Sequence, residues 1–320
     1  MTKKERVLAA IRQRPVDYVP SGFSLHFDPT LHGTPAEITA HLEFFEKTDT
    51  DIQKIMNENL VPDFGPVTQP EDWKTLNTFS RSAAFIQNQL EFTKKLLDNA
   101  DPDAYHLGTL HGIVASSIHP IEHRYGYAAV RELQCEHLRC GEPYLYDAMK
   151  RIAEALCYLA EGYAKAGVDG IYFASLGGEA RYFTDAEFGE YIAPLDTLIM
   201  QAGREAGLNV FLHCCKDGLV MERYRSYVPF SDVINWGVYE NPKYSLECGR
   251  ELFQNVTLMG GMSNLKGGLL HCGTPEQIAG EVRSILDTMG TCGFILGADC
   301  TLPPDTPYQN FRVAAHAARG

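Results

Sequence analysis

The chain has 320 residues and a formal net charge of −13 at pH 7. This charge argues against nucleic acid or an anionic membrane as a partner, because a phosphate-binding surface needs a basic face. No apolar stretch approaches the roughly 18 residues of a membrane span, and the charged start MTKKERVLAAIRQRP has no signal-peptide apolar core. We therefore expect a cytoplasmic protein. Nine cysteines, an odd number in a reducing compartment, argue against a disulfide framework.

Short apolar runs alternate with longer amphipathic segments along the chain. The apolar runs predict eight strands, at residues 19–27, 51–57, 104–112, 168–175, 209–215, 232–238, 256–263 and 293–300. Apolar residues at i, i+3, i+4 and i+7 predict helices within residues 80–100, 147–167, 188–207 and 274–290. Glycine indicates a helix stop at Gly167, Gly207 and Gly290, and Thr274-Pro275-Glu276 indicates a helix start. We expect Asp305 to cap the last helix.

Eight strands that alternate with helices favour an α/β protein with a (β/α)₈ TIM barrel. An open doubly wound sheet is the alternative. It would need a glycine-rich turn after the first strand, where this chain reads HFDPTLHG. We expect one domain over residues 1–320, with residues 1–18 forming a helix before the first strand. Since a TIM barrel builds its active site at the C-terminal ends of its strands, the residues at those ends are the candidate site residues.

The fifth predicted strand ends in FLHCCKDG, residues 211–218. Residues i and i+2 of a strand point to the same side, so His213 and Cys215 share a face and Cys214 points away. Cys300 ends the eighth predicted strand and can lie across the same barrel mouth. One histidine and two cysteines suit zinc, and three protein ligands leave a fourth position open, as in catalytic sites. The spacing alone leaves both a zinc site and a packed strand end possible, whereas a redox pair of Cys214 and Cys215 is disfavoured because they face apart.

Aromatic side chains near four strand positions predict an apolar wall against a substrate, formed by Tyr172, Phe173, Trp236 and Tyr239. Tyr172 and Phe173 are equally compatible with ordinary barrel packing. His26, Asn57 and His111 also follow strands, and the two histidines either bind a substrate or are satisfied by neighbouring protein groups.

Two carboxylates lie near other strand ends. Glu179 follows two glycines in SLGGEA, where the backbone could approach a ligand closely. It is a candidate proton donor or partner of a zinc ligand, with a solvated loop carboxylate as the alternative. Asp299 precedes Cys300 and should face away from it, which favours a packing hydrogen bond.

The segment GFILGADCTLPPDTPYQN, residues 293–310, resembles the C-terminal motif of the uroporphyrinogen decarboxylase superfamily. The segments TKKERVLAAIRQRPVDYVPSGF, DIQKIMNE, INWG, MGGMSN and GTPEQI also resemble that superfamily and occur in the same order. The resemblance therefore covers nearly the whole chain. It implies a (β/α)₈ barrel with its active site at the C-terminal mouth.

Two chemistries in the superfamily differ in their residues. The decarboxylases carry Arg-x-x-x-Arg after the first strand, where the guanidinium groups hold the carboxylates of the substrate. At that position this chain reads GFSLHFDPT, a segment without any arginine. The branch that includes methylcobamide:coenzyme M methyltransferases and O-demethylase methyltransferases instead carries His-x-Cys on the fifth strand and a cysteine after the eighth, as zinc ligands. The resemblance thus implies that zinc binds His213, Cys215 and Cys300.

The activity that this branch implies is methyl transfer between a small methylated compound, such as a methoxylated aromatic, or a thiol, and the cobalt of a corrinoid (cobalamin). No Asp-x-His-x-x-Gly corrinoid motif occurs in the chain, so a corrinoid protein is the expected partner, and a homodimer is common in the superfamily. We assign catalytic roles to Glu179 and His111, and substrate binding to His26, Asn57, Tyr172, Trp236 and Tyr239. Two alternatives are a metal-independent decarboxylase or lyase acting on a smaller acid, and a non-catalytic corrinoid or tetrapyrrole binder.

Overall fold

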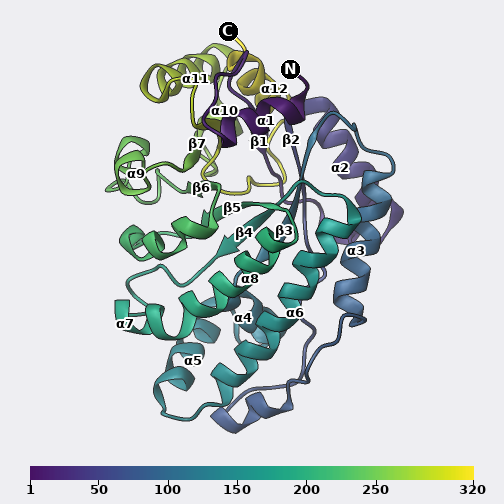
Figure 1. Cartoon of the computed structure of the whole chain (residues 1–320), viewed down its shortest axis with the longest axis vertical. Helices are drawn as coiled ribbons and strands as arrows, with labels where there is room; N and C mark the ends of the chain where they lie inside the picture. The colour runs from purple at the N-terminus through teal and green to yellow at the C-terminus, as the bar shows by residue number, and fades with distance from the viewer.

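The computed structural model describes all 320 residues and has a closed barrel of eight parallel strands in chain order (Figure 1). The strands are β1 (Ser21–Phe23), β2 (Ile52–Ile55), β3 (Tyr105–His111), β4 (Gly170–Ser175), β5 (Asn209–Cys214), β6 (Val233–Trp236), β7 (Thr257–Met262) and β8 (Phe294–Ala298). Each lies within one of the eight predicted runs, and β8 pairs with β1 to close the barrel. The predicted TIM barrel is confirmed, and the open doubly wound sheet is wrong.

Most of the helices surround the barrel on its outer face (Figure 1). The helices are α1 (Lys3–Ile11), α2 (Pro35–Thr48), α3 (Ala84–Leu97), α4 (Ile113–Tyr125), α5 (Tyr127–Arg139), α6 (Tyr144–Ala166), α7 (Asp185–Glu187), α8 (Ala193–Glu205), α9 (Leu246–Leu252), α10 (Leu269–Cys272), α11 (Pro275–Met289) and α12 (Tyr308–Ala317). Shorter turns are η1 (Pro29–Leu31), η2 (Pro70–Thr75), η3 (Phe188–Ile192) and η4 (Met221–Phe230). None of the helices is long and apolar enough to cross a membrane.

The predicted helix boundaries follow from local chemistry. Gly167 ends α6 in a left-handed conformation, and Thr274 caps α11 by accepting a hydrogen bond from the backbone N–H of Gln277. The expectation for Asp305 is wrong, because α12 begins only at Tyr308. The Asp305 carboxylate instead lies near Lys266 and His271.

The N-terminal end of the barrel is closed by α1. Val7 and Ala10 of α1 pack against inward-facing apolar side chains of the strands, among them Ile52, Phe211 and Ile295. Burying these side chains stabilises the barrel and leaves its opposite end as the only place for a mouth.

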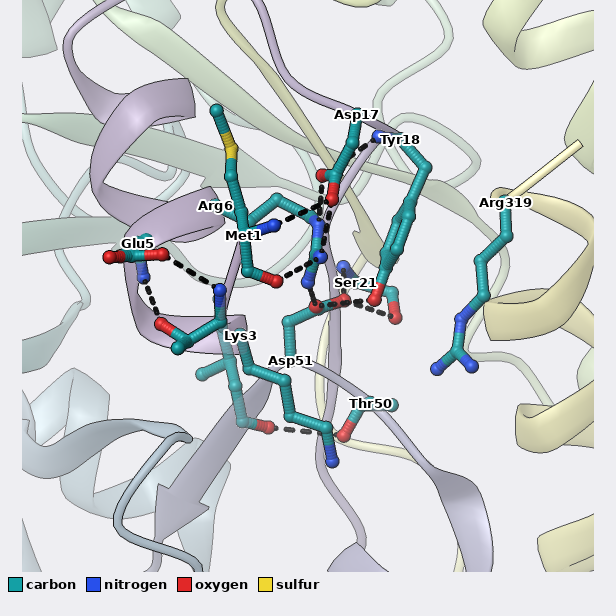
Figure 2. Close-up of polar contacts among 12 residues, drawn as sticks. Met1, Lys3, Glu5, Arg6, Asp17, Tyr18, Ser21, Thr50, Asp51 and Arg319 are labelled. Carbon is teal, nitrogen blue, oxygen red and sulfur yellow. Dashed lines mark hydrogen bonds and ion pairs between the residues drawn. The ribbon is translucent and has the colours of Figure 1, made fainter.

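A polar network ties α1 to the start of β2 (Figure 2). The buried Arg6 guanidinium donates to Asp51 at 2.6 Å and to Asp17 at 2.6 and 2.9 Å. Asp51 also accepts from the backbone N–H of Ser21 at 2.9 Å. Because each charge has close partners of the opposite sign or polarity, this burial is compatible with a stable fold.

Candidate metal centre

Three side chains with metal-binding atoms meet at the C-terminal mouth of the barrel. The ligand atoms of His213, Cys215 and Cys300 all lie within 4.8 Å of one another. Tetrahedral zinc with bonds of about 2.0–2.3 Å needs its ligand atoms roughly 3.3–3.8 Å apart. The three residues therefore need only small side-chain movements to hold one ion.

The Asn235 side chain of β6 fixes which nitrogen of His213 is free. The Asn235 amide nitrogen donates to two backbone carbonyls, those of Met259 at 3.0 Å and Ala298 at 3.1 Å. Its oxygen therefore faces His213 Nδ1, 2.6 Å away, and Nδ1 must carry the proton. Nε2 is buried, has no partner and presents its lone pair. This is the tautomer and orientation that a metal-ligating histidine needs.

The two thiols interact directly. The pKa of the Cys300 thiol lies well below its ordinary value, chiefly because of its hydrogen-bonding contact with Cys215 and also because of His213 and Lys54. The same contact raises the pKa of Cys215 well above its ordinary value. The two sulfurs are therefore close enough to act on each other's charge, and thiolates are the soft donors that zinc prefers.

The backbone directly after Cys215 is strained. Lys216 has φ of +85°, a left-handed conformation that non-glycine residues rarely adopt. The Asn241 amide donates to the Lys216 carbonyl at 3.0 Å and holds this turn. Strain of this kind persists only where the surroundings enforce it, and such sites are often functional.

Tyr172 and Lys54 flank the three residues. The Tyr172 ring stacks on His213 with ring centroids 5.2 Å apart, and its hydroxyl donates to Asn235 at 2.9 Å. The Lys54 ammonium lies 3.7 Å from the centroid of the Tyr172 ring. Burial lowers the pKa of Lys54 to about 8, although the two thiols act in the opposite direction.

Two predicted histidines lie at the same mouth. His111 is half-buried beside His119, with ring centroids 5.0 Å apart, and burial holds its pKa well below the ordinary value. His111 is therefore neutral at pH 7. His26 lines a cleft of about 410 Å³ at the ends of β1 and β2, together with Met56 and Glu58. This volume is in the range of small-molecule sites.

Two aromatic residues assigned to the substrate wall do not face the mouth. Trp236 is buried on the outer side of β6, donates to the Tyr244 carbonyl at 2.8 Å and packs on Phe253 of the α9 side. It faces outward because Asn235, its neighbour on the strand, faces inward. The Tyr239 hydroxyl donates to Glu281 of α11 at 2.9 Å, away from the barrel. Both assignments are corrected.

Phe173 is likewise buried in the outer core, as its alternation with Tyr172 requires. The Asn57 side chain accepts a hydrogen bond from the backbone N–H of Asn59 at 3.0 Å and so supports a turn. Asp299 accepts one from the backbone N–H of Tyr239 at 2.9 Å, which confirms its expected packing role.

Glu179 is fully buried in an ion pair with Arg131 of α5, at 2.8 and 3.3 Å. It also accepts from the backbone N–H of Gly177 at 2.8 Å. The alternative prediction, that Glu179 is a solvated loop carboxylate, is therefore wrong. The glycines before it serve packing, since a Cβ on Gly177 would meet Ile192 and one on Gly178 would meet Tyr224. Both oxygens of Glu179 are occupied by protein donors.

Sequence reasoning missed Asn235 and Lys54. Asn235 lies in the INWG segment, and strand alternation from an inward Val233 would have placed it inside. Lys54 alternates in the same way with the inward Ile52. Alternation along each strand is visible in the sequence, but it does not say which of the two faces points into the barrel. That is fixed only by pairing with the neighbouring strands.

The chain is similar to known proteins in sequence and in fold. The uroporphyrinogen decarboxylase (URO-D) family model matches residues 55–320. A methyltransferase from Methanosarcina mazei has the same fold with a TM-score of 0.78 and 18% sequence identity, covering 99% of this chain and 98% of that one. A B12-independent methionine synthase from Shewanella sp. W3-18-1 is similar with a TM-score of 0.54 and 13% identity, covering 95% and 94% of the two chains.

No curated protein matches the chain. At such identities the two solved structures establish the fold alone. The family model, in contrast, matches most of the chain. The protein therefore belongs to the uroporphyrinogen decarboxylase family.

Proposed function

We propose that this protein is a zinc-dependent methyltransferase. In this proposal it moves a methyl group between a small methylated compound and the cobalt of a corrinoid held by a separate protein. The observation that carries the proposal is the convergence of His213, Cys215 and Cys300 with an unpartnered, lone-pair-bearing His213 Nε2. The methyltransferase from Methanosarcina mazei, which has this fold, supports the methyl-transfer part of the proposal.

His213, Cys215 and Cys300 would hold the zinc ion and leave its fourth position open to a small molecule. Zinc bound there would act as a Lewis acid on the heteroatom that carries or receives the methyl group. We favour the donor side, with a methoxylated or otherwise methylated compound as substrate.

The other residues of the mouth bind and orient in this proposal. Asn235 holds the His213 ring in its ligating tautomer, and Tyr172 covers one face of that ring. Tyr172 and His26 would contact the substrate, and the neutral His111 would hydrogen-bond it or accept a proton. Glu179 would keep the β4 loop in place through Arg131, because its oxygens have no room for a substrate proton.

The test is a methylation assay with free cob(I)alamin. Reduced protein would be incubated with cob(I)alamin and a panel of methoxylated and methylated compounds, and cobalamin methylation would be followed by absorbance. We expect activity that Cys215→Ala and Cys300→Ala abolish and Cys214→Ala retains, since Cys214 is buried on the opposite face of β5. Acid decarboxylation that survives in both ligand variants would instead favour the metal-independent lyase.

A further inference from the structure

Lys54 differs from Arg6 and Arg131, the two fully buried basic residues, in its lack of a carboxylate partner. Arg6 pairs with Asp51 at 2.6 Å, and Arg131 pairs with Glu179 at 2.8 Å. The half-buried Lys54 ammonium donates only to the Ser24 hydroxyl, at 3.3 Å, and otherwise lies over the Tyr172 ring. An ammonium has three donor hydrogens, so two of them have no protein acceptor.

The position of this ammonium is next to the candidate metal centre. Lys54 faces the barrel interior, as does Ile52 two residues before it on β2. Lys54, Tyr172 and Cys300 line one cavity of about 10 Å³, which has room for a single water molecule. Tyr172 in turn stacks on His213. Through Cys300 and Tyr172, Lys54 therefore borders the candidate metal site.

The charges around Lys54 leave it without a counter-ion once a metal is bound. The groups that act on its charge are the thiols of Cys215 and Cys300 and the exposed carboxylate of Glu58. Two thiolates and a neutral imidazole would offset the two positive charges of a bound zinc ion. Those thiolates would then no longer compensate the ammonium, and a charge withdrawn from water needs a partner.

We propose that Lys54 binds an acidic group of the small-molecule substrate. The inference rests on the proposed function and names its substrate class: a methylated compound that bears a carboxylate or an equivalent oxyanion, rather than a neutral ether or a quaternary amine. Lys54 donates to the oxyanion, and the Ser24 hydroxyl lies beside it. The cost of leaving the ammonium unpaired disfavours neutral substrates.

The test uses cobalt(II)-substituted protein and two small thiols that differ in charge, 3-mercaptopropionate and 2-mercaptoethanol. Binding would be followed by the thiolate-to-cobalt absorption band, which reports affinity without any methyl transfer. We expect the wild type to bind the carboxylate thiol about 10- to 100-fold more tightly. Lys54→Met should remove this preference and leave the cobalt content and the affinity for 2-mercaptoethanol unchanged. Lys266→Met, an exposed lysine on the same end of the barrel, is the matched control and should keep the preference.

Equal affinity of the wild type for both thiols, or a preference that survives in Lys54→Met, would overturn the proposal. Loss of cobalt from Lys54→Met would also overturn it, since Lys54 would then be needed for metal binding by the two thiolates rather than for binding a substrate. If the wild type takes up no cobalt, the proposed function fails, and a second experiment on metal-free protein then tests the binding of an acidic group by Lys54. Calorimetry on metal-free protein would compare 4-methoxybenzoate with 4-methoxybenzamide. Tighter binding of the acid by wild type but not by Lys54→Met supports the site, and no difference rejects it.

Discussion

At the N-terminal end of the barrel, each nitrogen of the buried Arg6 guanidinium donates to an oxygen. At the C-terminal end, His213 Nε2 has no partner, the Lys54 ammonium has a single hydrogen bond, and Lys216 has a strained backbone. A satisfied polar network stabilises a fold, whereas unsatisfied groups lower its stability and persist where a ligand completes them. The difference indicates that the first end serves stability and the second serves binding.

The largest effect should come from Arg6→Met at the N-terminal end. The change leaves the Asp51 carboxylate buried beside no cation, and breaking a buried pair costs about 3–5 kcal/mol. Urea unfolding would measure the loss in free energy of unfolding, and elemental analysis should find the metal content of the folded protein unchanged. A loss of metal that parallels the loss of stability would show that the two ends are not separate.

Ionisation of Asp196 should make the free energy of unfolding depend on pH. This buried carboxylate accepts hydrogen bonds from the Ile113 N–H and from the hydroxyls of Ser175 and Tyr227. Burial raises its pKa from 3.8 to about 6. Between these values the folded protein holds a proton that the unfolded chain has lost, so this group's contribution to stability falls as pH rises.

The measurement is the difference in free energy of unfolding between wild type and Asp196→Asn, taken from pH 4 to pH 7. We expect wild type to lose up to about 3 kcal/mol relative to the variant over this range, at about 1.4 kcal/mol per pKa unit. A difference that stays constant with pH, or that grows in favour of wild type as pH rises, would contradict the assignment.

Asn235→Leu should weaken metal binding without unfolding the barrel. The change removes the acceptor that orients His213, and losing such a partner typically costs 10- to 100-fold in metal affinity (about 1.4–2.7 kcal/mol). Competition with a chromogenic chelator would measure the zinc affinity. Trp236→Phe is the control, since the next side chain on β6 faces outward and its loss should not change zinc affinity. Equal affinity in all three proteins would remove Asn235 from the site.

The smallest effect should come from the strained turn. At φ of +85° glycine is unstrained, whereas alanine bears a steric cost of about 1–2 kcal/mol. Lys216→Gly should therefore be more stable than Lys216→Ala by roughly 1 kcal/mol in urea unfolding, and both variants lack the lysine charge. Equal stability of the two would mean that the turn relaxes and stores no strain.

The barrel could be predicted from the sequence because its signals are local. Apolar runs mark the strands, and caps such as Thr274 and Gly167 mark helix ends. The pairing of His213 with Cys215 followed from strand alternation, but the place of Cys300 depended on closure of the barrel. Trp236 was misplaced because the inward face of β6 is fixed only by its neighbours. The partner of Glu179 lies 48 residues away on α5, and no local pattern joins them.

The central claim is that His213, Cys215 and Cys300 form a zinc site. The most direct test is elemental analysis of fully reduced protein purified without a metal-affinity tag, for wild type and Cys300→Ala, with the exposed Cys292→Ala as control. We predict about one zinc per chain in wild type and Cys292→Ala, and none in Cys300→Ala. Wild type without zinc, or Cys300→Ala with as much zinc as wild type, would contradict the account.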